Sequence, residues 1–182
     1  MKYTKITLIT IAIIIASILL GVFAFQGVQN KAISLEEQIY TAHSDIDVQQ
    51  KRRADLIPNL VDCVKAYDEH EYQTLMDVVD ARGVNSDEDV AEIQTMINAV
   101  AEDYPELKSS ENYQELMNEL ATTENLIANY RSNYNDCVKN YNRYTRKFPN
   151  NSILNMLGYE IIEYSYLSYD VSEDAPTDLF GE

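Results

Sequence analysis

The chain has 182 residues, which is enough for one membrane-spanning segment and one domain. It carries 30 Asp and Glu against 14 Lys and Arg, for a formal net charge of −16. A surface of that sign repels nucleic acid and anionic lipid headgroups, so nucleic-acid binding is excluded, although the charge is also explained by solubility alone.

The chain begins with a short basic tail, residues 1–5, followed by a run of 20 residues without a charge, from Ile6 to Phe25. As a helix, such a run rises about 30 Å, which matches the hydrocarbon core of a bilayer. The alternative is a secretory signal peptide cleaved after the small-residue pattern at residues 22–24. The uninterrupted length and the Phe25–Gln26 sequence favour a single-pass transmembrane helix over residues 6–25.

The basic residues near this segment predict its orientation. Lys2 and Lys5 precede it, and within 20 residues after it stands only Lys31. Under the positive-inside rule the amino terminus faces the cytoplasm. We therefore expect a protein of the cell membrane whose large domain is extracytoplasmic.

The region after the anchor, residues 26–169, reads as helix throughout. Glycine and proline are sparse and apolar residues recur at spacings of three and four, with no strand-like alternation. The predicted fold is all-α, an antiparallel long-helix bundle of the four-helix type. The four expected long helices cover residues 28–53, residues 56–82, Ser86 to just before Pro105, and Ser109 or Ser110 to about Lys147.

Two features follow the long helices. Ser152 could cap a short final helix that runs on toward Tyr166. Residues 170–182 contain five acids and no base, a composition typical of a disordered acidic tail.

The fourth long helix has the clearest pattern. Ten residues from Leu116 to Phe148 alternate at spacings of four and three, a heptad pattern typical of a coiled-coil seam. Its second half, from Tyr130 to Tyr144, is mostly tyrosine, which buries its ring and keeps its hydroxyl near water or a partner. The seam is either bundle core or an aromatic groove for a ligand.

The stretch KRRADLIPNLV, residues 51–61, combines three bases with a proline in an apolar run. Pro58 either kinks one continuous helix or lies in the first turn of a new helix whose N-cap is Asp55. Asp47 and Asp55 are each four residues from Lys51, a spacing that pairs charges on a helix. Arg52 and Arg53 are therefore part of an ion-paired helix end or of a docking patch for an acidic partner.

No constellation of catalytic or metal-ligating residues is present in the sequence. His43 and His70 lack the Glu-x-x-His pattern of carboxylate-bridged metal sites, and no glycine-rich phosphate loop occurs. Cys63 and Cys137 are too far apart in sequence for a zinc motif. We expect no enzyme activity, no metal and no cofactor. The two cysteines either form one disulfide in an oxidising compartment or remain reduced core thiols.

Two blocks, residues 44–71 and 104–149, resemble the signature of the LemA family. The resemblance implies a membrane-anchored long-helix bundle in a bacterial envelope, without established enzymatic activity. This chain departs from the family at His43, where a tryptophan is common, and its cysteines are not part of the family pattern. The resemblance marks the following residues as structural or partner-contact candidates: Arg52, Arg53, Asp55, Pro58, Asn59, His70, Glu71, Glu124, Asn125, Arg131, Tyr134, Asn135, Tyr141, Asn142 and Pro149.

The resulting hypothesis is a non-catalytic, membrane-anchored scaffold or interaction module whose partners are other proteins. The alternative is a sensor that binds a ligand or a metal on its tyrosine-rich or acidic helix faces.

Overall fold

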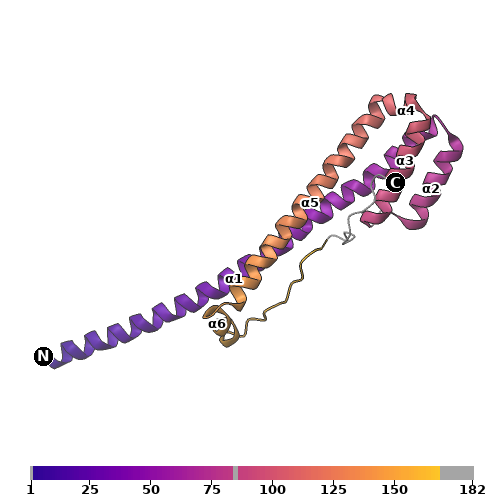
Figure 1. Ribbon diagram of the computed structural model, residues 1–182. Coiled ribbons are helices and arrows are strands. Elements are labelled where there is room, and N and C mark those ends of the chain that lie inside the picture. Colours follow the sequence, from indigo (N-terminus) through magenta and orange to yellow (C-terminus); the bar gives the residue numbers. More distant parts are fainter. Residues whose placement is uncertain (1, 84–85, 169–182) are drawn as a thin grey trace, which may run out of the picture. The chain divides into compact units, whose positions relative to one another are not determined.

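The computed structural model describes residues 2–83 and 86–168, the side chains of residues 2–7 and of Arg82 excepted. The predicted acidic tail at 170–182 lies outside the described residues. Within them, regular structure is entirely α-helical, which confirms the all-α prediction. The helices are α1 (Lys2–Lys65), α2 (Glu69–Arg82), α3 (Asp87–Asp103), α4 (Pro105–Ser109), α5 (Glu111–Arg146) and α6 (Asn150–Met156) (Figure 1).

The chain divides into two compact units. Unit 1 comprises Met1–Glu36 and Tyr134–Glu182, and unit 2 comprises Glu37–Asn133. α1 and α5 each contribute residues to both units, so each unit is described separately below.

The first part of α1 is apolar, and its side chains from Leu8 to Phe25 are largely exposed. An 18-residue window there has a mean hydropathy of 2.9 and no buried residues. By length and composition this helix meets the requirements for crossing a membrane, as a signal sequence also does.

Pro58 lies inside α1, which continues to Lys65, so the alternative of a new helix capped by Asp55 is wrong. Leu56, Ile57 and Leu60 on either side of the proline are buried in the core, and this packing offsets the lost backbone hydrogen bond. The expected single helix over residues 56–82 is also wrong, because the chain breaks at residues 66–68 and α2 begins at Glu69.

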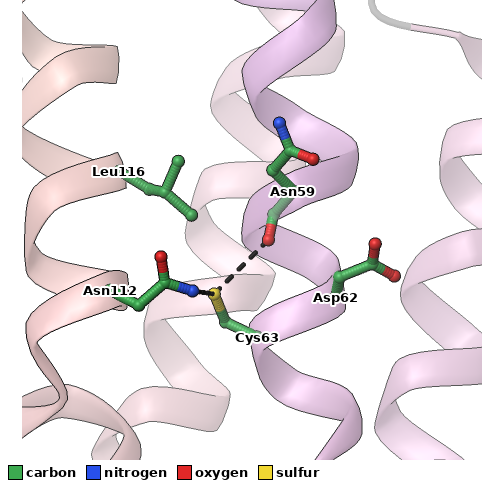
Figure 2. A pocket seen from close by; sticks show the side chains of 5 residues that line it. All are labelled: Asn59, Asp62, Cys63, Asn112 and Leu116. Carbon is green, nitrogen blue, oxygen red and sulfur yellow. Dashed lines mark hydrogen bonds between the residues drawn. The ribbon is translucent and has the colours of Figure 1, made fainter.

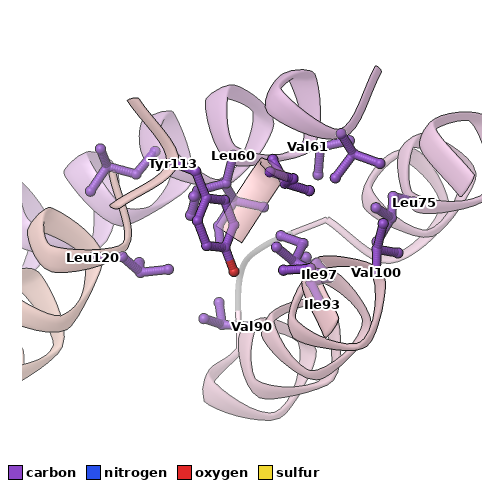
Figure 3. Close-up of a cluster of buried hydrophobic side chains, with 14 residues drawn as sticks. Leu60, Val61, Leu75, Val90, Ile93, Ile97, Val100, Tyr113 and Leu120 are labelled. Carbon is purple, nitrogen blue, oxygen red and sulfur yellow. The ribbon is translucent and has the colours of Figure 1, made fainter. Parts of the chain in front are cut away.

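The core of unit 2 is formed by α1, α2, α3, α4 and the first half of α5 (Figure 3). α3 follows Ser86, where its start was predicted, and begins with a capping box in which the side chains of Ser86 and Asp89 each accept a hydrogen bond from the other's backbone N–H. As predicted, α3 ends before Pro105, which then opens the short helix α4. The core of this unit contains Leu56, Ile57, Leu60, Val61, Val64, Leu75, Val90, Ile93, Ile97, Val100, Ala101, Leu107, Tyr113 and Leu120.

The predicted seam of α5 is buried or half-buried from Leu116 to Tyr144, but its last member, Phe148, is 79% exposed. α6 starts at Asn150 and ends at Met156. The predicted continuation toward Tyr166 is wrong, because Gly158 has a φ of 70° and residues 159–168 contain no helix. Side chains of α5 bind the backbone of this extended segment in place of helical hydrogen bonds.

Candidate functional site

The most deeply buried charge in unit 2 is Arg53, whose side chain is 1% exposed. Its Nη1 donates to Oδ1 of Asp87 at 2.8 Å and to Oε1 of Glu124 at 3.3 Å. Arg131 also binds Asp87, through both terminal nitrogens. The four side chains come from α1, α3 and α5, so the cluster ties three helices together.

The electrostatics of this cluster favour the ionised carboxylate. The hydrogen bond from Arg131, followed by that from Arg53, holds the pKa of Asp87 below its ordinary value, although burial acts in the opposite direction. Nε of Arg53 and Oε1 of Gln49 are buried without a hydrogen-bond partner. Burying these groups is costly, so the ion pairs must offset a real desolvation penalty. The arrangement holds helices together and leaves no reactive group poised for chemistry.

The three consecutive bases point in different directions. Lys51 is exposed and pairs with Asp55 at 3.3 Å, one of the two predicted pairings, whereas Asp47 bonds to His43. Arg52 is half-exposed and reaches Glu119 of α5. Arg53 turns into the core as described, so the three bases do not form one continuous patch.

A cavity of about 390 Å³ lies beside α1 and α5 in unit 2. We call it the Asn59 groove; Asn59, Asp62, Cys63, Asn112 and Leu116 line it (Figure 2). The Cys63 thiol donates to the Asn59 carbonyl at 3.4 Å and accepts from Nδ2 of Asn112 at 3.2 Å. Figure 2 shows Cys63 and Asn112 pointing toward each other between the two helices.

The Cys63 thiol is not set up as a nucleophile. Burial and the neighbouring Asp62 carboxylate raise its pKa, and the hydrogen bond from Asn112 offsets only part of that effect. Burial, together with Asp136, also raises the pKa of Cys137. Both cysteines are free thiols in the structure.

The candidates His70 and Glu71 lie at the start of α2. Their backbone N–H groups donate to Oδ1 of Asp68, the N-cap, at 2.8 and 3.1 Å. Tyr104 donates its hydroxyl to the other carboxylate oxygen at 2.7 Å, and this bond is the largest cause of the lowered pKa of Asp68. The backbone N–H groups of His70 and Glu71 therefore form the N-terminal cap of α2 with Asp68.

In unit 1 the candidates on α5 bind the extended segment at residues 159–168. The Asn135 amide donates to the carbonyl of Leu167 and accepts from its N–H, both at 2.8 Å. Asn142 donates to the carbonyl of Tyr164 at 3.4 Å, and the hydroxyl of Tyr141 accepts from the N–H of Ile162 at 3.3 Å. These side chains supply the hydrogen bonds that a neighbouring strand would otherwise give.

Tyrosine hydroxyls join the extended segment of unit 1 to α1. Tyr159 donates to Oε2 of Glu36 at 2.6 Å, and Tyr164 donates to Oε1 of the same carboxylate at 3.2 Å. Burial, followed by the hydrogen bonds of its hydroxyl with Glu36 and Tyr141, raises the pKa of Tyr159. Tyr134 and Tyr141 are buried, as a bundle core requires, and Tyr164 packs edge-on against Tyr141 with ring centroids 5.3 Å apart.

Neither the remaining candidate, Asn125, nor the acidic residues in the described part of the chain form a site for chemistry. Asn125 is exposed. Among the described residues, no group of three or more His, Cys, Asp or Glu is arranged to hold a metal ion.

Three residues with long-range contacts were not predicted as candidates from the sequence: Asp87, Asn112 and Glu36. Asp87 lies in the first turn of α3, where the helix dipole alone favours an acidic residue. Its arginine partners are far away in the sequence, so no local pattern indicates that it pairs with them.

The fold and these contacts define an all-α bundle protein with an N-terminal apolar helix, in which charged and amide side chains tie the helices together. The family model of the LemA family matches residues 42–178, and the chain belongs to that family. It is 26% identical over 147 residues to Protein LemA of Metamycoplasma hominis, an alignment that covers 74% of this chain and 67% of that protein.

Proposed function

We propose that this LemA-family chain is a non-catalytic, membrane-anchored interaction module of the bacterial envelope. The apolar part of α1 would anchor it in the cell membrane, and the surplus of bases before this segment favours an extracytoplasmic bundle. The Asn59 groove would contact a protein partner.

The observation that carries this proposal is how the structure uses the polar residues that the family resemblance marked. Arg53, Glu124 and Arg131 take part in a partly buried ion-pair cluster, and Asn135 and Asn142 bind backbone. Such use builds a rigid support. Asn59 also binds backbone, through a 3.0 Å hydrogen bond from its side-chain amide to the Asp55 carbonyl, but it is exposed and lines the Asn59 groove.

The lining of the Asn59 groove indicates the kind of partner. Asp62 provides a carboxylate, Asn59 and Asn112 provide amides, and Leu116 provides an apolar wall. Together with the strongly acidic sequence, this lining fits a protein segment that bears a basic or amide side chain.

Photocrosslinking in intact membranes tests the groove. A photoreactive amino acid at Asn112 should give a discrete crosslinked protein, and Asp62→Arg should abolish that product. The matched control is Glu102→Arg, an exposed acid on α3, which should leave the product unchanged. A product that survives Asp62→Arg, or no product at all, would contradict the groove assignment.

Two further measurements separate this proposal from its alternatives. Resistance of the full chain to alkaline carbonate extraction is expected of a membrane anchor, and digestion of the bundle in intact protoplasts is expected of the extracytoplasmic orientation. Near-stoichiometric metal in elemental analysis of the purified chain would instead support a metal-dependent sensor.

A further inference from the structure

The charge of this acidic protein is unevenly distributed along the sequence. Residues 137–159 contain four bases and not one Asp or Glu. The first 35 residues also lack acids. Both the chain before Glu36 and the stretch around the α5–α6 connection therefore carry only neutral and basic residues. The bases of the second stretch are Lys139, Arg143, Arg146 and Lys147.

The same connection exposes two large apolar side chains. Phe148, in the turn between α5 and α6, is 79% exposed, and Met156 at the end of α6 is 69% exposed. Exposed aromatic and apolar side chains beside Lys and Arg are the composition of a surface that meets lipid headgroups and the outer acyl region.

Contacts within unit 1 place this turn near the end of the apolar segment. The Tyr144 hydroxyl donates to the carbonyl of Val28 at 3.2 Å. Val28 is three residues beyond Phe25, the last residue of the apolar run, a rise of about 4.5 Å along α1.

The direction of α5 extends this argument to Phe148. Tyr141, one turn before Tyr144, contacts the hydroxyl of Tyr159, which binds Glu36, farther from the apolar run than Val28. Toward its C-terminus α5 therefore approaches the apolar segment (Figure 1). Phe148, four residues beyond Tyr144, lies at about the level where the apolar run ends.

We propose that the α5–α6 turn is a second membrane contact, in which Phe148 enters the interface and Arg143 and Lys147 meet anionic headgroups. This inference rests on the anchor proposed above. The net negative charge of the whole chain does not oppose it, because charges more than about 8 Å away are largely screened at physiological salt.

The chain contains no tryptophan, so a single introduced indole can report its depth in the bilayer. Three full-length variants, Phe148→Trp, Phe25→Trp and Val48→Trp, are reconstituted in vesicles of phosphatidylcholine and phosphatidylglycerol with brominated acyl chains. Phe25 reports the anchor, and Val48, 60% exposed in unit 2, is the aqueous control. We expect strong bromine quenching and blue-shifted emission at 148 and 25, with neither at 48.

The outcomes separate this inference from the anchor itself. Quenching at 25 without quenching at 148 would overturn the membrane contact and leave the anchor intact, whereas no quenching at either position would overturn both. Blue-shifted but unquenched emission at 148 would mean that protein, such as a second copy of the chain, covers Phe148, and this would also overturn the inference.

A charge-reversal arm tests the headgroup contact. In the Phe148→Trp background, Arg143→Glu with Lys147→Glu should reduce quenching severalfold in phosphatidylglycerol vesicles. Quenching that stays the same would overturn the role of the bases. The matched control reverses Lys108, an exposed base of unit 2, and should change nothing. Unchanged helical circular dichroism confirms that each variant is folded.

Discussion

The side-chain amide of Asn135 makes two hydrogen bonds of 2.8 Å with the backbone of Leu167, one to each polar group of that residue. The amide thus pairs with an extended backbone as a neighbouring strand would. This contact explains how residues 159–168 remain ordered without regular secondary structure.

Replacing Asn135 with leucine, which has a similar size, should release the extended segment. Both polar groups of Leu167 lose their partner, so we expect the free energy of unfolding to fall by about 1–3 kcal/mol. Limited proteolysis of the full chain in detergent should show faster cleavage within 159–168. Asn140→Leu, at an exposed position on the same helix, is the control. Equal cleavage rates in both variants would contradict the assigned role.

Adjacent arginines allow a matched comparison of buried and exposed ion pairs. Arg53→Met should cost about 3 kcal/mol, the low end for breaking a buried pair, because its carboxylate partners are 50% and 36% exposed and can be hydrated. Arg52→Met removes an exposed pair and should cost about 0–1 kcal/mol. Chemical denaturation of both variants measures the difference. Equal losses would show that burial of Arg53 does not govern its contribution.

The lowered pKa of Asp87 predicts how stability responds to acid. Because the pKa of Asp87 in the folded protein lies below its ordinary value of 3.8, the ionised carboxylate stabilises the fold at pH values above 3.8. This contribution is lost as the pH falls through the folded pKa. The stability difference between wild type and Asp87→Asn should therefore be constant between pH 7 and about pH 5 and shrink below about pH 4. Denaturation at several pH values measures it, with the exposed neighbour Glu88→Gln as control. A difference that stays constant to pH 3 would contradict the prediction.

The thiol of Cys63 should react slowly with alkylating agents. In a Cys137→Ser background it is the only thiol, and its raised pKa leaves little thiolate at neutral pH. Removing the negative charge of Asp62 should lower that pKa and accelerate alkylation at pH 8. Asp62→Asn is compared with Asp80→Asn, an exposed acid on α2, by mass spectrometry of iodoacetamide adducts. If the two variants react at the same rate, Asp62 does not control the thiol.

Local sequence signals predicted much of the fold. The spacing of apolar residues identified α5, and Ser86 and Pro105 marked the two ends of α3. Pro58 was the most conspicuous breaker, yet the chain breaks at residues 66–68. The burial of Ile57 and Leu60 holds the helix through the proline, and such tertiary packing is not visible in local propensity.

The polar contacts were harder to predict. Glu124 was marked only by family resemblance. Arg53 was also marked by its place among three consecutive bases, but nothing in the spacing of the sequence joins it to Asp87, 34 residues away. The extended segment was expected to be helical because its local composition allows a helix. Its actual structure depends on Asn135, Tyr141 and Asn142, which reach it from more than 20 residues away.

The contacts of Glu36 also bear on the order in which the chain folds during synthesis. Its partners Tyr159 and Tyr164 follow it by 123 and 128 residues, whereas unit 2 is one continuous stretch. On a ribosome, unit 2 can close as soon as its own residues have emerged. Unit 1 must wait until almost the whole chain has been made, because its closing contacts join the beginning of the chain to its end. During that interval the Glu36 carboxylate, just beyond the apolar segment, is still without the two tyrosines that later bind it.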